Sequence, residues 1–598
     1  MHRSLALERL HELPFSLRRR ALAAASGDAE ELGLLNMSPA NVARLLPLYY
    51  AGLEAADIPP LLAQLDLSST GSGFQAFTRK LSHVVMCLQG ILLFDTHRPS
   101  GLSAPLSADL WARVWPWMLF LDTYRDNLPR LNITDVNPLS LIMVLGQHGE
   151  VSRSMRMTPG FFVVVFRAWK MILGQKTQLP GEFEILCACM HNLRLPGPIT
   201  DDQFEEAIEG SGGSTLSFAR LCVDHVKCVV KSVVPGGVDS IWCVIACLHK
   251  RCEKDDSFRV TLVNQGILPA LASAACRFSS PPFTTQNNLL HMPRIIQYFI
   301  TVSGHSMLTE ALHRGLLRAV LTWGRMRDPQ ILEPLNLILN AFSRSSVYLS
   351  VLLQFQKSIK DLEPSIDSHT FRGFPVSDDW ETLWSILQTR WALMDIYLER
   401  EKLSACGNIE CCLIASKSVF KRCSHCLAKY CSKECQIYDW QHGAHRQHCS
   451  LKFVDPQIVA GTRSRQFLKA LLHDDYLRLK HTILNNQLAY LRANPGTSLY
   501  VQFDYRTGVC EVSVKALDNE MWKRENARTS KSEGRMQIHM MRVSDGLYGE
   551  VTYIFPLYSS TGECRIGIEA LAAKDACEET DRAQIQHLLE LDILETHL

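Results

Sequence analysis

The 598-residue sequence predicts a mainly α-helical protein with a cysteine-rich segment and a small α+β domain after it. Three observations predict this fold class. Apolar residues recur at helical spacing over residues 36–402, with short breaks at Gly, Pro, Asn and Asp. Eight cysteines then fall within residues 403–450. After them, one long amphipathic stretch gives way to short runs of β-like composition.

These changes of pattern predict four parts. We expect an N-terminal segment over residues 1–35 and a helical domain over 36–402. The cysteine-rich segment covers 403–450, and the α+β domain covers 451–598. The N-terminal segment has no continuous apolar core, so we do not expect a secretory signal there.

Composition narrows the class of function. Hydrophobic residues make up 47% and charged residues 21% of the chain, which is typical of a soluble protein without a membrane segment. A net charge of +1 provides little attraction for nucleic acid, which we therefore do not expect as a partner. The cysteines outside the cysteine-rich segment are scattered through apolar helical stretches, where free thiols behave as small hydrophobes. We therefore expect reduced thiols and an intracellular location, cytoplasmic or nuclear.

Five helices are most clearly indicated in the helical domain. The second is rich in aromatic residues, which we expect to face the core, and Pro116 should kink or divide it. The five cover residues 41–53, 110–128, 217–234, 238–252 and 379–403.

Two segments of this domain look alike. Residues 260–271 and 309–320 each end a helix, turn on a glycine and begin a new apolar helix. The glycines, Gly266 and Gly315, are 49 residues apart, close to the period of about 40–47 residues in armadillo and HEAT repeats. The domain therefore resembles an armadillo-like helical stack. An irregular helical domain with chance similarity is the alternative.

An acidic, glycine-rich stretch at residues 205–215 resembles a phosphate-binding loop only superficially. It lacks the Gly-Lys-Ser/Thr ending, and no apolar strand precedes it. We expect a flexible loop.

After the cysteine-rich segment, the sequence predicts a helix, four strands and a final helix. Residues 506–508 are expected to form a hairpin turn between the first two strands. His473, Asp474 and Asp475 on the first helix are expected to lie on a solvated face. The helices are expected at 465–493 and 581–595, and the strands at 498–503, 509–515, 536–543 and 550–557.

The spacing of the cysteines predicts metal binding. Four pairs of ligands would make two four-coordinate sites, the closed arrangement that structural Zn²⁺ prefers, so we expect two Zn²⁺ per chain. A segment this short cannot build a large apolar core, and metal binding would supply its folding free energy. The pairs are Cys406-x4-Cys411, Cys423-x2-Cys426, Cys431-x3-Cys435 and His445-x3-Cys449.

Some assignments remain open at this level. Cys412 directly follows Cys411 and could replace it as a ligand. His442 and His448 lie near His445, but only His445 keeps the three-residue gap to Cys449. A set of buried thiols and an iron–sulfur site are the alternatives to zinc for these cysteines.

Local spacing agrees with paired ligands. Cys431 and Cys435 are four residues apart, as are His445 and Cys449, so each pair can share one face of a helical turn. Ser432 is placed to cap the helix that carries Cys435. Residues 404–450 carry a net charge of +3, which seven thiolates and two Zn²⁺ would bring to about zero.

The segment resembles a MYND-type zinc finger. The ligand order, the Tyr-Cys-Ser-x-x-Cys-Gln run that begins at Tyr430, and the Asp439–Trp440 pair all coincide with that family over about 45 residues. The first pair has four intervening residues where two are common, and nine residues separate Cys435 from His445 where seven are common. Both departures resemble mushroom-type fungal members, as does the aromatic run at residues 110–117.

The resemblance implies cross-braced ligands. One zinc would be held by Cys406, Cys411, Cys431 and Cys435. The other would be held by Cys423, Cys426, His445 and Cys449.

The family also implies a function. Closed zinc sites have no open position for a substrate, and these fingers generally bind proteins, some of them proline-containing peptides in a groove. Gln436 and Trp440 occupy positions that the family uses for such contacts, although Trp440 could instead pack between the zincs. We therefore predict an adaptor or scaffold, not an enzyme.

Two other functions remain as alternatives. A nuclear transcription or chromatin cofactor would use the same biochemistry. A lysine methyltransferase-like enzyme is less favoured, because its SET domain should supply an Asn-His-x-Cys run, and the sequence contains no Asn-His pair.

Overall fold

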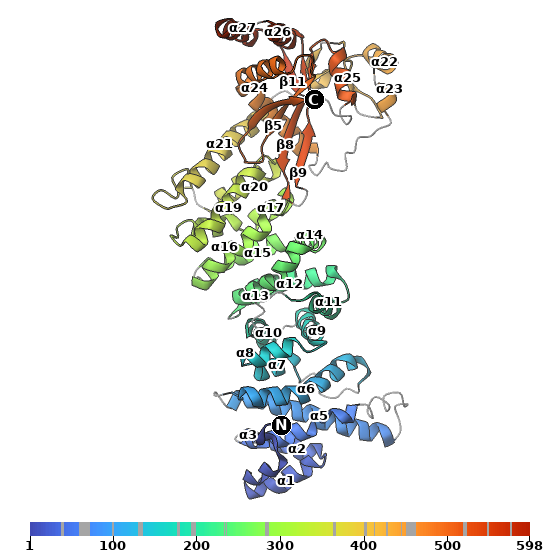
Figure 1. Cartoon of the computed structure of the whole chain (residues 1–598), viewed down its shortest axis with the longest axis vertical. Coiled ribbons are helices and arrows are strands. Elements are labelled where there is room, and N and C mark those ends of the chain that lie inside the picture. Colours follow the sequence, from blue (N-terminus) through green and yellow to red (C-terminus); the bar gives the residue numbers. More distant parts are fainter. Residues whose placement is uncertain are drawn as a thin grey trace. The chain divides into compact units, whose positions relative to one another are not determined.

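The computed structural model (Figure 1) describes most of the chain. The described residues are 1–37, 41–58, 72–97, 101–128, 136–175, 180–192, 199–232, 234, 236–280, 286–362, 366–399, 403–411, 413–425, 428–443, 445–449, 462–517, 523–546, 549–574 and 577–597.

The chain divides into two compact units, Met1–Ala270 and Leu271–Leu598. The described part of the first unit is helical. Its elements are η1 (Arg3–Leu5), η2 (Leu7–Glu12), α1 (Phe15–Ala25), α2 (Ala29–Asn36), α3 (Val42–Gly52), η4 (Ala55–Asp57), α5 (Ser72–His97), α6 (Ala104–Thr123), η5 (Arg125–Asn127), α7 (Pro138–Leu145), α8 (Gly149–Arg156), α9 (Phe161–Gly174), α10 (Pro180–Asn192), α11 (Asp201–Ser211), α12 (Thr215–Ser232), α13 (Gly237–Lys254) and α14 (Asp256–Asn264). Helix α15 (Ile267–Phe278) contains the boundary between the units.

The second unit begins with helices and then becomes mixed. Its helices are α16 (Gln286–Ile300), α17 (His305–His313), α18 (Leu316–Trp323), α19 (Pro329–Ser345), α20 (Leu349–Leu362), α21 (Ser377–Glu399), η7 (Lys417–Val419), α22 (Lys433–Gln441), α23 (His445–His448), α24 (Thr462–Ala493), α25 (Lys523–Lys531), α26 (Glu563–Ala572) and α27 (Glu578–Glu590). Its strands are β1 (Leu403–Ala405), β2 (Ile414–Ser416), β3 (Lys421–Arg422), β4 (Lys429–Tyr430), β5 (Leu499–Asp504), β6 (Glu511–Ala516), β7 (Met536–Gln537), β8 (His539–Ser544), β9 (Glu550–Ile554), β10 (Leu557–Ser559) and β11 (Glu595–His597).

The predicted fold class is confirmed: a mainly helical region, a cysteine/histidine region and a small α+β region follow one another. Pro116 lies inside α6 without dividing it, and the aromatic residues Trp111, Trp115 and Phe120 are buried as predicted. The last predicted helix is too long at its C-terminal end. It ends at Glu590, and Glu595 opens strand β11 instead.

The expectation of a flexible loop at residues 205–215 is wrong. Helix α11 covers this stretch up to Ser211, and a capping box between Thr200 and Gln203 begins it. A Cβ on Gly210 would lie 2.4 Å from the carbonyl oxygen of Val163, so glycine here permits close packing of α11 on α9. Only residues 212–214 form the turn that leads into α12.

The two similar segments have the predicted local structure. Gly266, with φ of +84°, joins α14 to α15, and Gly315, with φ of +94°, joins α17 to α18. Both turns require the left-handed backbone conformation that glycine adopts without strain. In the second unit, α16 packs on α19, α17 on α20, and α19 on α21, so each helix contacts others farther along the chain.

The described residues of the α+β region form two sheets. The larger has the strand order β6-β5-β8-β9, in which β5 and β8 are parallel and the other pairs are antiparallel. The predicted hairpin turn at residues 506–508 joins β5 to β6, and Gly508 has a φ of +95° there. The smaller sheet has the order β11-β10-β7.

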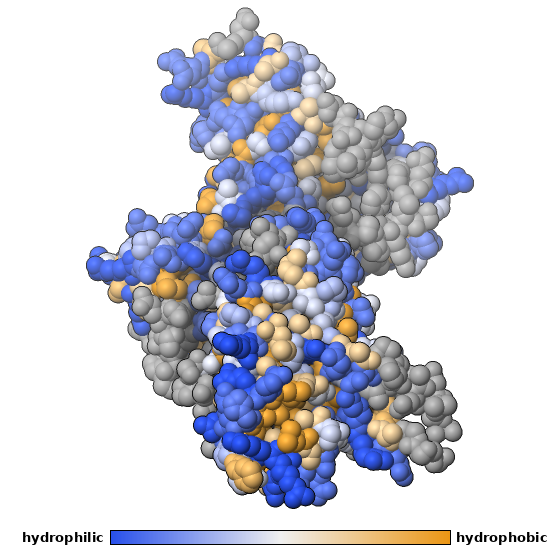
Figure 2. Space-filling view, turned by 60° about the horizontal axis from the view of Figure 1, so that its bottom comes forward, coloured by the Kyte–Doolittle hydropathy of each residue, from blue (hydrophilic) through white to orange (hydrophobic). Residues whose placement is uncertain are grey.

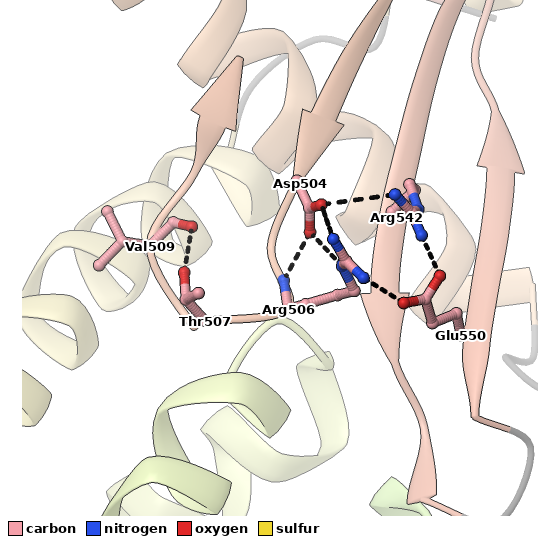
Figure 3. A network of polar contacts seen from close by, with 6 residues as sticks. All are labelled: Asp504, Arg506, Thr507, Val509, Arg542 and Glu550. Atoms are coloured by element: carbon pink, nitrogen blue, oxygen red, sulfur yellow. Dashed lines mark hydrogen bonds and ion pairs between the residues drawn. The ribbon is translucent and has the colours of Figure 1, made fainter. Parts of the chain in front are cut away.

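An ion-pair network ties the ends of three strands of the larger sheet (Figure 3). The Asp504 carboxylate accepts hydrogen bonds from the Arg506 guanidinium at 2.7–3.0 Å and lies 3.7 Å from that of Arg542. Glu550 on β9 pairs with both arginines. Because Asp504 and Arg542 are the last register partners of the parallel pair, the network stabilises the end of the pairing between β5 and β8.

Helix α24 packs against the sheets and contributes to their core. Leu484, Leu488 and Leu491 pack with Leu499 of β5 and with residues of α26 and α27. The face that carries His473 and Asp475 is not solvated, which corrects the sequence-based expectation. Asp475 is buried and accepts a hydrogen bond from the Tyr505 hydroxyl at 2.6 Å, and His473 is half-buried.

The first helices of unit 1 leave apolar side chains exposed. Phe15 and Leu22 on α1 are 87% and 64% exposed, and Leu34 and Met37 nearby in sequence are also exposed. Figure 2 brings this end forward and shows apolar residues between hydrophilic ones.

Length and composition together decide whether a helix could cross a membrane. Within the described residues, no single helix is both long and apolar enough to do so. Among the described helices, α8 and α9 are the one bent pair that together has the required length and composition, and they are bent by 95° at their junction.

Candidate metal centre

Short hairpins and helices position the ligand side chains. Cys406 follows β1, and its N–H donates to the Leu413 carbonyl oxygen at 3.1 Å across the β1–β2 pair. In the turn, the Asn408 carbonyl oxygen accepts from the Cys411 N–H at 3.0 Å. Cys423 follows β3 and donates its N–H to the Ala428 carbonyl oxygen at 2.8 Å. Each cysteine therefore lies at the end of a hydrogen-bonded strand or turn.

Strand β4 and helix α22 position the next pair of ligands, Cys431 and Cys435. Cys431 follows β4, and Cys435 lies in the first turn of α22. The Ser432 hydroxyl accepts a hydrogen bond from the Cys435 N–H at 3.2 Å, so the predicted helix cap is confirmed. The cap fixes the backbone between the two thiols.

The seven described candidate ligands lie in two groups. Cys406, Cys411, Cys431 and Cys435 form the first group, whose ligand atoms all lie within 4.8 Å of one another. The second group holds Cys423, His445 and Cys449 under the same limit. Cys426 and the alternative ligand Cys412 lie outside the described residues.

The order of the groups along the chain is interleaved. Cys423 comes between Cys411 and Cys431 in sequence, yet it belongs to the second group. Each group thus joins two segments that are separated by part of the other group. Metal ions bound by both groups would hold the whole cysteine-rich segment together as one unit.

The sulfur–sulfur distances match metal ligation. The Sγ atoms of Cys411 and Cys431 are 3.7 Å apart, and those of Cys431 and Cys435 are 3.4 Å apart. In the second group, Cys423 and Cys449 are also 3.7 Å apart. A tetrahedral ion with Zn–S bonds of about 2.3 Å would place its sulfurs about 3.8 Å apart, whereas a disulfide needs about 2.05 Å. The described cysteines of these groups are all free of disulfides.

The acid–base chemistry of the ligands favours a metal ion as the balancing charge. Burial raises the pKa of Cys406, and it raises that of Cys431 to about 11. For Cys435, burial raises the pKa, but hydrogen bonds from Cys431 and Asn408 outweigh it and lower the pKa overall. Burial lowers the pKa of His445, which favours the neutral imidazole that binds metal. Ion binding would therefore release thiol protons.

Two residues support His445 in a way that sequence spacing did not reveal. The Tyr430 hydroxyl donates to the buried Asp439 carboxylate at 2.6 Å, and the Tyr430 ring lies 5.4 Å from the His445 ring. The Asp439 charge acts to raise the pKa of His445, opposing burial. Both residues belong to the Tyr-Cys and Asp-Trp motifs, so the motifs were visible but their mutual contact was not.

The two candidate peptide-binding residues both lie on α22. Gln436 is half-buried, and Trp440, one helical turn later, is 42% exposed. The Trp440 ring meets the His445 ring edge-on at 5.2 Å. Ile437 and Tyr438 beside it are also exposed. Trp440 is therefore partly exposed and also packs against a candidate ligand of the second group.

The segment is not separate from the α+β region. Ala405, Ile409 and Ile414 share a buried core with Met536 and Ile538 of the C-terminal region. The Arg528 guanidinium on α25 also donates to the Gly407 carbonyl oxygen at 3.3 Å. The first ligand loop is thus built partly on the β7–β8 segment.

Comparisons with known proteins add no family assignment. No protein-family model matches this chain, and no curated protein matches it.

Proposed function

We propose that the chain is an intracellular adaptor whose cysteine-rich segment is a MYND-type finger holding two Zn²⁺ ions. The interleaved arrangement of the two ligand groups supports this proposal most strongly. Four thiols in the first group, and two thiols with one histidine in the second, are donors of the kind that structural Zn²⁺ prefers. Cys426 would complete the second group.

The zinc would have a structural role in this proposal. Four cysteines would fill a tetrahedral ion in the first group, leaving no position for water or a substrate. The ions would instead hold α22 in place and present its exposed residues. Ile437, Tyr438 and Trp440 are exposed apolar residues on this short helix. Aromatic residues on such surfaces are frequent anchors for protein partners.

A proline-containing peptide suits this surface. An exposed indole offers a flat face on which a proline ring can pack, and Gln436 on the same helix can hydrogen-bond a peptide backbone. The exposed residues Phe15 and Leu22, with Arg19 between them on α1, offer a second apolar surface on unit 1. An adaptor would use two such surfaces for two partners.

We expect Trp440→Ala to lower the affinity for proline-containing peptides at least about tenfold, because the anchoring ring is lost. A fluorescence-based screen of such peptides against the zinc-loaded full chain measures this. Val419→Ala, which truncates another exposed apolar residue of the finger, is the matched control and should bind as the parent does.

Zinc content is measured on the same samples, and Trp440→Ala should retain two ions per chain. Equal affinity of the parent and Trp440→Ala would contradict the proposed peptide surface. Absence of peptide binding by the parent would contradict the adaptor role in this form.

A further inference from the structure

Strand β11, the last described strand, is short and is held mainly by contacts of its side chains. It has only three residues, Glu595–His597, paired antiparallel with β10, and all three are buried. Two of them, Glu595 and His597, contact helix α24. Glu595 accepts hydrogen bonds from the Tyr476 hydroxyl at 3.0 Å and from the Lys480 ammonium at 2.8 Å. This ion pair fastens one end of the strand.

Three imidazole rings fasten the other end. His597 Nδ1 lies 3.0 Å from His473 Nδ1 on α24, and His597 Nε2 lies 2.8 Å from His539 Nδ1 on β8. Both ring nitrogens of His597 are therefore used. The rings form a continuous hydrogen-bonded chain that joins α24, β11 and β8.

The number of ring protons determines how the three hydrogen-bonded imidazole rings respond to acid. Three neutral imidazoles carry three ring protons; two occupy the inter-ring hydrogen bonds and the third sits on an outer nitrogen. A fourth proton fills the remaining outer nitrogen, so His539 Nε2 must then carry one. That atom is buried without a hydrogen-bond partner among the described residues. A fifth proton would place two N–H groups against each other and break the chain.

The surrounding charges do not favour added protons. Glu595 is the carboxylate on the same strand, and Lys480 already neutralises it. Asp475 is engaged by Tyr505 and Arg478. Among the described residues, further titratable groups around these side chains are Tyr476 and Lys469 on α24 and Cys564 on α26.

The pKa directions agree with this geometry. Burial, the neighbouring imidazoles of His539 and His473, and Lys469 lower the pKa of His597 well below its usual value. Burial lowers the pKa of His539 to about 3. The closed strand therefore requires neutral rings.

We propose that β11 is an acid-sensitive latch, which the chain of His473, His597 and His539 keeps closed at neutral pH and which opens as the pH falls. A released histidine titrates near about pH 6.5, whereas the closed state binds these protons only at much lower pH. Opening is therefore favoured progressively below about pH 6.5. Because β11 packs beside β1, which leads into Cys406, opening would also loosen the support of the first ligand loop.

Amide hydrogen exchange of the zinc-loaded full chain at about pH 7.0 and about pH 5.5 tests the latch, after correction for the intrinsic effect of pH on exchange. His597 and His539, whose pKa values burial lowers, each add about 8-fold to opening over this interval, and together they add about 70-fold. We expect that acceleration in residues 595–597 and much less in β5 and β6.

Two variants separate a latch from general acid sensitivity. His539→Gln removes one titrating ring, so the pH-dependent acceleration should fall from about 70-fold to about 8-fold, even if the strand is weaker at both pH values. His587→Gln, an exposed histidine of α27, should keep the full acceleration.

Three results would overturn the proposal. They are exchange of β11 without pH dependence, an unchanged acceleration in His539→Gln, and equal acceleration of β5, β6 and β11. The proposal does not rest on zinc or peptide binding, so its outcome is independent of the adaptor proposal.

Discussion

Cys431→Ser is expected to destabilise the C-terminal sheets as well as the ligand segment. Cys431 contacts both Cys411 and Cys435 through sulfur, so serine would disrupt the first group. Loss of a structural zinc removes folding free energy on the order of 10 kcal/mol from an isolated finger. In this protein the loss of stability extends to the C-terminal sheets, because Ile409 and Ile414 would leave the core that they share with Met536 and Ile538. Exposing two isoleucines costs about 3–6 kcal/mol.

Hydrogen exchange of β7 and β8 measures this coupling. We expect residues 536–544 to lose protection in Cys431→Ser and in the chelator-treated parent. Cys577→Ser, which changes an exposed cysteine outside both ligand groups, is the matched control and should leave the protection unchanged. Loss of protection confined to residues 403–449 would show that the finger folds independently of the sheets.

Arg390→Met is expected to lower the free energy of unfolding by about 3–5 kcal/mol. The Arg390 guanidinium is buried and donates to the Ser343 carbonyl oxygen at 3.0 Å, to the Ser346 hydroxyl and to the Gly508 carbonyl oxygen. It therefore joins α19 and α21 to the β5–β6 turn. Burial lowers its pKa to about 10, which leaves it charged at neutral pH. Methionine would remove the Arg390 donor from the Gly508 carbonyl oxygen, whereas the Ser343 carbonyl oxygen would keep the hydrogen bond from the Ser346 hydroxyl at 2.8 Å.

Chemical denaturation at neutral pH measures the Arg390 effect. Arg390→Lys should recover only part of the loss, because an ammonium group cannot reproduce the planar fork of donors. Arg372→Ala, at an exposed arginine, should change stability by less than about 0.5 kcal/mol. A loss below about 1 kcal/mol in Arg390→Met would contradict the structural role.

Sequence reasoning succeeded where the signal was local. The ligand spacing, the Ser432 cap and the Gly508 turn each depend on a few neighbouring residues, and the structure has all three features among its described residues. The strands predicted at 498–503, 509–515 and 550–557 lie close to β5, β6 and β9. The strand predicted at 536–543 is divided between β7 and β8, which belong to different sheets, and β11 was not predicted. Local propensity and turn chemistry are sufficient for such features.

Sequence reasoning failed where distant residues decide the structure. The sequence around Gly210, with its acidic neighbours, is typical of a loop. Packing on α9 outweighs the low helix propensity of glycine there. Asp475 read as solvated, yet Tyr505, far along the chain, covers it. The His473–His597–His539 chain could not be predicted, because its members are far apart in sequence and meet only after the sheets form.

The zinc content of the purified chain and of one variant in each ligand group tests the central claim most directly. The account predicts two Zn²⁺ per chain, and about one in Cys435→Ser and in Cys449→Ser, because these cysteines belong to different groups. Cys577→Ser should retain two. A parent chain with one zinc or none, or variants that both keep two, would contradict the paired metal centre.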